Sequence, residues 1–67
     1  MSNEQLRRFI RCYMNDAEVA ASFLSTALKA ASTTPPAERL AAEQLCLKYE
    51  AEFNRNSDAA IELLYCL

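Results

Sequence analysis

The sequence predicts an all-α protein, an antiparallel hairpin of two long helices at about residues 3–32 and 35–66. Apolar residues recur at helical spacing through both halves of the 67-residue chain. The only two prolines, Pro35 and Pro36, stand side by side near the midpoint, and the chain has no glycine. Two helical halves of nearly equal length across a short connection predict that the second helix folds back along the first, within a single domain of residues 1–67.

The first helix is predicted from apolar residues at alternating steps of four and three, which is the heptad spacing of a coiled-coil seam. Ser2 can cap its start, and Gln5 three residues later completes a capping box. The residues of this seam are Leu6, Ile10, Tyr13, Ala17, Ala20, Leu24, Ala27 and Ala31.

The segment "STTPP", residues 32–36, is predicted to end one helix and begin the next. A residue that precedes proline avoids the helical region, so the first helix must end near Ser32. Proline fits the first turn of a helix, where its missing N–H would have no intrahelical partner. Thr34 is expected to cap that second helix.

The second helix has one weak point, "NRNSD" at residues 54–58, because these residues have poor helix propensity. A third helix capped by Ser57 or Asp58 could begin there. The heptad spacing keeps its phase across the segment, which favours one continuous or mildly bent helix. The residues of this second seam are Ala42, Cys46, Tyr49, Phe53, Asn56, Ala60, Leu63 and Leu67.

A hairpin that turns between residues 34 and 35 sets which residues face each other. It places Ala20 opposite Tyr49, so that a small side chain meets a large one. It also places the polar Asn56 opposite Tyr13, whose hydroxyl could bond to the amide. The predicted hairpin core is Leu6, Ile10, Tyr13, Ala17, Ala20, Leu24, Tyr49, Phe53, Asn56 and Leu63.

Apolar residues outside this core predict a surface that binds another chain. Two helices can shield only one stripe of each other, and a monomer seldom leaves an apolar patch of several hundred Å² exposed. We expect a second hairpin or a partner helix to complete a bundle; a bent three-helix arrangement that covers the patch internally is the alternative. The predicted partner-binding residues are Phe9, Cys12, Val19, Phe23, Leu40, Leu47 and Ile61.

The composition argues against catalysis and against metal or cofactor binding. The chain has no histidine to act as a general base near neutral pH, and no glycine for a phosphate-binding loop. Cys12, Cys46 and Cys66 are too few and too far apart for a zinc site, and their odd number predicts free thiols in a reducing compartment. Without a targeting segment or a membrane-spanning apolar run, we expect a cytoplasmic, non-enzymatic protein with no small-molecule substrate.

Nucleic-acid binding also finds little support in the sequence. Arg7, Arg8 and Arg11 form a basic cluster, but the net charge of the chain is −2. Binding to a phosphate backbone normally needs a longer basic stripe and positive charge overall. We interpret the cluster as a solvated helix end that comes near Asp58 and Glu62 of the second helix.

The two long amphipathic segments joined by "STTPP" give the chain an architecture that resembles the E-component (YscE-type) co-chaperones of type III secretion systems. The resemblance implies a cytosolic hairpin that pairs with a helical-repeat partner and helps to hold the needle subunit unpolymerised. The segment "RRFIRCY", residues 7–13, is similar to the basic first helix of Rop-type plasmid RNA-binding bundles. That likeness implies, as an alternative, a homodimeric four-helix bundle that binds RNA in a regulatory role.

Overall fold

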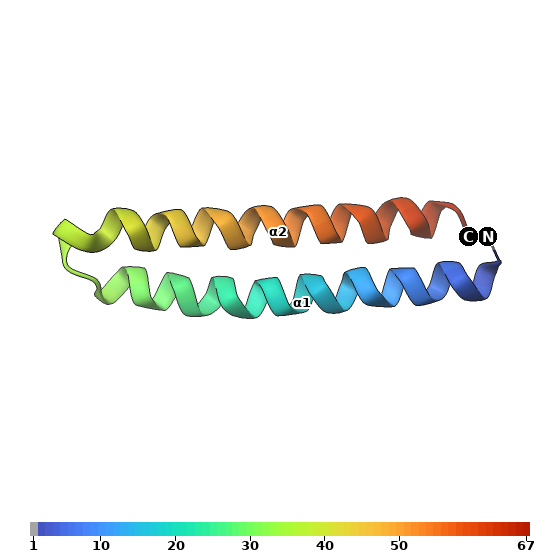
Figure 1. The fold of residues 1–67 in the computed structure, drawn as a ribbon, viewed down its shortest axis with the longest axis horizontal. Helices are drawn as coiled ribbons and strands as arrows, with labels where there is room; N and C mark the ends of the chain where they lie inside the picture. The colour runs from blue at the N-terminus through green and yellow to red at the C-terminus, as the bar shows by residue number, and fades with distance from the viewer. Residues whose placement is uncertain (1) are drawn as a thin grey trace.

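The computed structural model describes residues 2–67, which form two long helices packed side by side in opposite directions (Figure 1). Helix α1 spans Asn3–Thr33 and helix α2 spans Arg39–Tyr65; a short 3-10 turn, η1, covers Pro36–Glu38 between them. The start of α1 and the end of α2 lie at the same end of the molecule. The predicted antiparallel hairpin is confirmed, and α2 runs without a break through residues 54–58.

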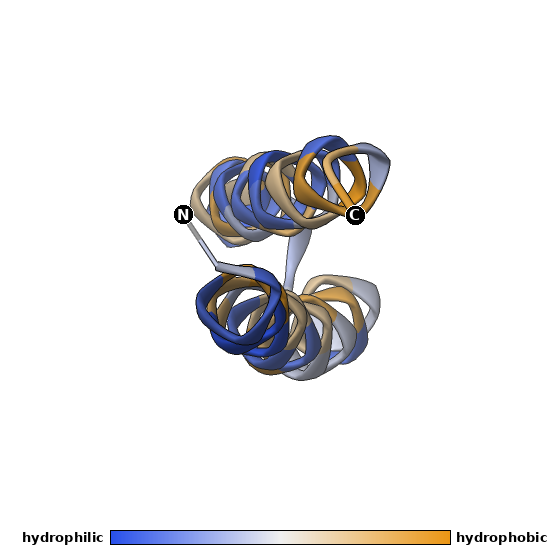
Figure 2. Cartoon of the chain, turned by 90° about the vertical axis from the view of Figure 1, so that its right-hand side faces the viewer, coloured by the Kyte–Doolittle hydropathy of each residue, from blue (hydrophilic) through white to orange (hydrophobic). Residues whose placement is uncertain are grey.

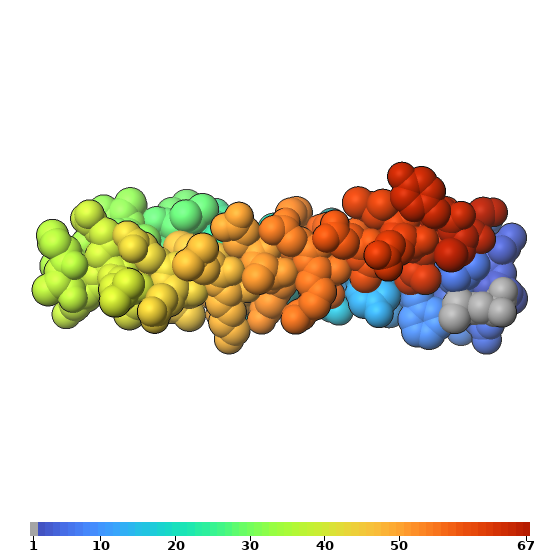
Figure 3. Space-filling model, turned by 90° about the horizontal axis from the view of Figure 1, so that it is seen from above, coloured from blue at the N-terminus to red at the C-terminus, as the bar shows by residue number. Residues whose placement is uncertain are grey.

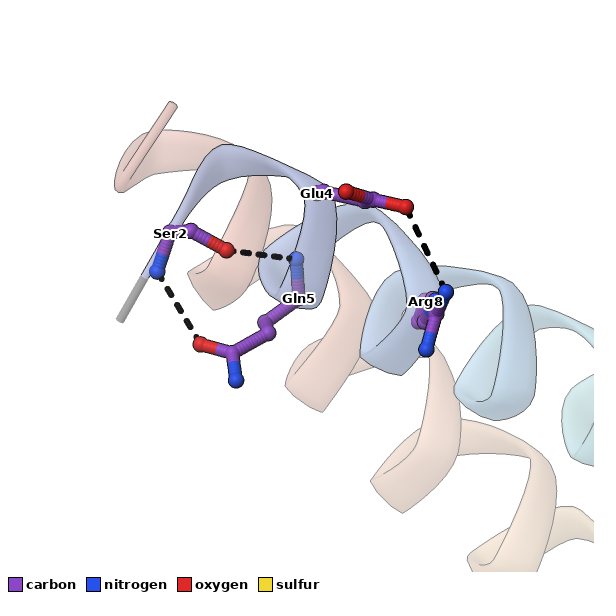
Figure 4. A network of polar contacts seen from close by, with 4 residues as sticks. All are labelled: Ser2, Glu4, Gln5 and Arg8. Atoms are coloured by element: carbon purple, nitrogen blue, oxygen red, sulfur yellow. Dashed lines mark hydrogen bonds and ion pairs between the residues drawn. The ribbon is translucent and has the colours of Figure 1, made fainter.

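Helix α1 begins with the expected capping box (Figure 4). The Ser2 hydroxyl accepts the backbone N–H of Gln5 at 3.2 Å, and the Gln5 side-chain oxygen accepts the backbone N–H of Ser2 at 3.1 Å. These bonds satisfy two donors at the helix start that have no partner within the helix. One turn further on, Arg8 pairs with Glu4 at 3.3 Å on the exposed surface of α1.

Side-chain hydroxyl groups bond to backbone carbonyls at the end of helix α1. Many helices end on a glycine in the left-handed conformation, and this chain has no glycine. The hydroxyl of Ser32 donates to the carbonyl of Lys29, that of Thr33 lies within bonding distance of the carbonyls of Lys29 and Ala30, and that of Thr34 donates to the carbonyl of Ala30. Thr34 therefore terminates α1, and the expectation that it caps the second helix is wrong.

The proline pair sets where α2 can start. Thr34 and Pro35 both have extended backbone, with ψ of 137° and 149°, because each of them precedes a proline. Pro36 is consequently the first residue that can enter a helical turn, and α2 proper begins only at Arg39. The connection is thus centred on Pro36, which shifts the pairing of the two helices by about three residues, nearly one turn, from the expected pairing.

The hairpin is a single layer with a narrow buried seam. Its Cα atoms extend over 51 × 14 × 11 Å. Seen end-on, the two helices lie side by side with no third element over either side (Figure 2). From above, atoms of α1 emerge on both sides of α2, so the helices cross slightly along their length (Figure 3). The buried residues among those described are Leu6, Ile10, Ala17, Ala20 and Ala60.

The other residues expected in the hairpin core lie along the same seam but are less buried. Tyr13, Leu24, Tyr49, Asn56 and Leu63 are half-buried, whereas Phe53 is 36% exposed. The amide nitrogen of Asn56 donates to the carbonyl of Glu52 at 3.0 Å, within α2. The expected bond across the hairpin from Tyr13 is therefore replaced by a bond along the helix.

We predict that Ala20→Leu destabilises the hairpin by about 1–3 kcal/mol, because the side chain is only 3% exposed and a larger one would overpack the seam. Ala51→Leu is the matched control, since Ala51 is exposed on α2 and the substitution is the same. Urea unfolding followed by circular dichroism measures both variants. Equal stability of the two would contradict close packing at Ala20.

Candidate partner-binding faces

The hairpin has two apolar faces, one on each side of the buried seam. Residues three, four or seven apart share a side of a helix, so the spacing along α1 assigns its apolar residues to two groups. We call one side the Phe9 face, defined on α1 by Phe9, Cys12, Val19 and Phe23, and the other the Met14 face, defined on α1 by Met14, Ala21 and Leu28.

The Phe9 face has a hollow near the open end of the hairpin. The hollow has a volume of about 400 Å³ and lies between Phe9 and Tyr13 of α1 and Ala59, Glu62, Leu63 and Cys66 of α2; Glu62 is its one charged residue. Its lining is mainly apolar, which suits an apolar side chain from another chain more than a charged ligand.

An aromatic pair lies further along the same face. The rings of Phe23 and Tyr49 are stacked, with their centroids 5.3 Å apart and an angle of 21° between the ring planes. Phe23 nevertheless remains 52% exposed. Ala20 was the expected neighbour of Tyr49 and lies about one turn earlier in α1, as the shifted pairing requires. Phe23 thus contacts the other helix of its own hairpin as well as solvent, which the interpretation of Phe23 as a partner residue alone missed.

The Met14 face has a hollow of about 300 Å³ with an almost wholly apolar lining. Ala17 and Ala60, both buried, form its floor. The walls are larger, more exposed side chains from both helices, namely Met14, Phe53, Ile61 and Leu64. The seven-residue spacing of Met14, Ala21 and Leu28 was the sequence signal for this face. Of the residues that line its hollow, the predicted partner set contained only Ile61.

All seven predicted partner residues are exposed, but the hairpin does not bring them together. Phe9, Cys12, Val19 and Phe23 share the Phe9 face. Ile61 lines the hollow of the Met14 face, and Leu47 lines a further hollow with Leu28 near the connection. Leu40 is exposed and lines none of these three hollows.

Ion pairs contribute little to the hairpin. Within residues 2–67 the one ion pair is Arg8 with Glu4, whose side chains are 74% and 80% exposed, so it adds little stability. The expected approach of the arginine cluster to Asp58 and Glu62 produces no ion pair. Over the same described residues, no group of three or more Cys, Asp or Glu side chains is placed to hold a metal ion. None of the helices described is both long and apolar enough to span a membrane.

No protein-family model, curated protein or solved structure matches this chain.

We predict a coupling energy of about 0.5–1.5 kcal/mol between Phe23 and Tyr49, the range for a stacked aromatic pair. A double-mutant cycle of Phe23→Leu, Tyr49→Leu and the double variant, measured by urea unfolding at one protein concentration, gives this value. Leucine keeps much of the apolar area and removes the stacking. Additive effects of the two substitutions would show that the rings do not interact.

We predict that all three cysteines are free thiols of unequal reactivity. Cys12 and Cys66 are exposed on the single hairpin, whereas Cys46 is half-buried, so in protein dilute enough to be monomeric a water-soluble alkylating reagent should label Cys46 last. Mass spectrometry of peptides from a time course, on protein purified without reductant, measures the order. A disulfide within one chain, or fastest labelling of Cys46, would contradict this arrangement of the helices.

Proposed function

We propose that this protein is a helical interaction module whose Met14 face binds an amphipathic helix of a different protein. The hollow between α1 and α2 on that face carries the proposal. A third helix laid along the hairpin would place apolar side chains, one turn apart, against this surface, which is the helix-in-groove mode of recognition.

The shape of the hollow suits such a helix. Ala17 and Ala60 leave space at its floor, so a partner side chain can enter between the wall residues. Met14 is an unbranched, flexible side chain that can adapt to differently shaped partners. Ser57 and Glu18 are the two polar residues of the lining, so the partner would dock mainly through apolar contacts.

The sharper form of the proposal is a co-chaperone role in the cytosol, resembling that of the type III secretion E-components. Support for it is architectural, namely the two long helices with an uncovered apolar face on each side. By covering the apolar helix of a subunit that would otherwise self-associate, such a hairpin would keep the subunit unassembled. Three free thiols agree with a reducing compartment.

The test is affinity capture of partners by the tagged full chain from cells of its source, followed by mass spectrometry. We expect a helical protein whose binding to the purified chain is lost in Met14→Glu, because a carboxylate would be buried without a partner. Asn15→Glu is the control. Asn15 is exposed but lies on neither face, and the substitution adds the same charge.

Salt separates this proposal from RNA binding. Apolar docking should keep its affinity across a roughly tenfold rise in salt concentration, whereas phosphate contacts from Arg7, Arg8 and Arg11 would weaken steeply. A captured nucleic acid that is released by salt and retained by Met14→Glu would overturn the proposed function.

A further inference from the structure

We propose that a second copy of this chain covers the Phe9 face, so that two hairpins stack in opposite directions as a four-helix bundle. The inference rests on the proposed function in treating the apolar faces as binding surfaces. The helix of the different protein would occupy the Met14 face, and the second copy would occupy the Phe9 face.

The exposed area of the hairpin matches the requirement of a stable dimer. The chain exposes 5141 Å² at a mass of 7.5 kDa. A folded monomer of that mass typically exposes about 4,250 Å². The excess of about 900 Å² arises from the single-layer rod, and it is close to the ~800 Å² that each partner buries in a stable interface of standard size. Covering the Phe9 face with one further hairpin would remove this excess exposed area.

The Phe9 face is also complementary to itself. Its hollow lies at Phe9 and Tyr13, and the exposed ring of Phe23 stands ten to fourteen residues further along α1, or about 15–21 Å. Consider a two-fold axis on the Phe9 face, perpendicular to the rod and midway between the hollow and Phe23, at the height of residue 17 along α1. This axis would exchange the two features. Phe23 of each copy would then lie at the hollow of the other copy, as an isologous interface requires.

The position of this axis favours a second copy over a shorter partner. Ala17 lies close to the middle of α1, which spans Asn3–Thr33. Two hairpins related by an axis at that point overlap along their whole length, so neither leaves an uncovered end. Asp16 is the one charged residue on the α1 side of the Phe9 face, and the axis brings it near its own counterpart in the other copy. Repulsion between the two carboxylates limits the affinity of the dimer.

Sedimentation equilibrium across the micromolar range tests the dimer and the face that forms it. We expect wild-type protein to dimerise, Val19→Glu to weaken the dimer by at least about tenfold because it buries an unpaired charge, and Met14→Glu to leave it unchanged. The two residues are matched, since both lie on α1 and are 47% and 53% exposed. Circular dichroism at high protein concentration checks that each variant remains helical. A wild-type monomer at every concentration, or the opposite effect of the two variants, would overturn the proposal.

Cross-linking tests the position of the axis. Facing helices 8–10 Å apart bring facing Cα atoms to about 4–6 Å, which suits a disulfide. In a chain that carries Cys12→Ser, Cys46→Ser and Cys66→Ser, adding Asp16→Cys should give an intermolecular disulfide under mild oxidation. The variant that retains only Cys12 should form no such disulfide, because the Cys12 thiols of the two copies would lie about 15 Å apart along the rod. Cross-linking through Cys12 and not through residue 16 would overturn this arrangement.

The two proposals fail separately. A monomeric hairpin that still captures a helical protein through Met14 would remove the dimer and keep the proposed function. A dimer that resists Met14→Glu and captures no other protein would keep the dimer and remove the proposed function.

Discussion

The packing of α1 against α2 along one narrow seam is the constraint on which the rest of the structure depends. Small residues at Ala17, Ala20 and Ala60 let the helices approach closely, but they bury little apolar area. Only Leu6 and Ile10 are large buried side chains, and each is worth about 1.5–3 kcal/mol when fully removed from water. Domains normally need two packed layers to enclose a core, and this hairpin supplies one. Its large apolar side chains therefore remain at the surface.

The seam of α1 could be predicted from the sequence because burial imposes the heptad spacing directly. All eight residues of that spacing are buried or half-buried in the hairpin. The predicted register between the helices was wrong, and the reason lies in the two prolines of the connection. The rule that a residue before proline avoids the helical region applies twice in this connection, to Thr34 and again to Pro35. Applied once, it places the turn too early, and every cross-hairpin pairing then shifts by about one helical turn.

The surface was harder to predict than the seam, because periodicity identifies apolar residues and does not say which of them share a face. Residues on α1 and α2 come together only after the register and the crossing of the helices are fixed. Ile61 and Phe9 carry the same apolar signal, yet they line hollows on opposite sides. Phe23 shows a second limit, since its contact with Tyr49 depends on the same register.

Folding and association should be linked in a hairpin of this kind. A partner that binds the folded form and not the unfolded chain adds to stability in proportion to the logarithm of its concentration. With so few large side chains buried, that contribution is a large part of the total, so the midpoint of unfolding should rise with protein concentration if hairpins associate. Phe23 affects both processes, because its ring packs on Tyr49 and remains half exposed. Val19 is 47% exposed and has no ring to stack across the hairpin. Its substitution should therefore separate association from folding, whereas substitution of Phe23 changes both together.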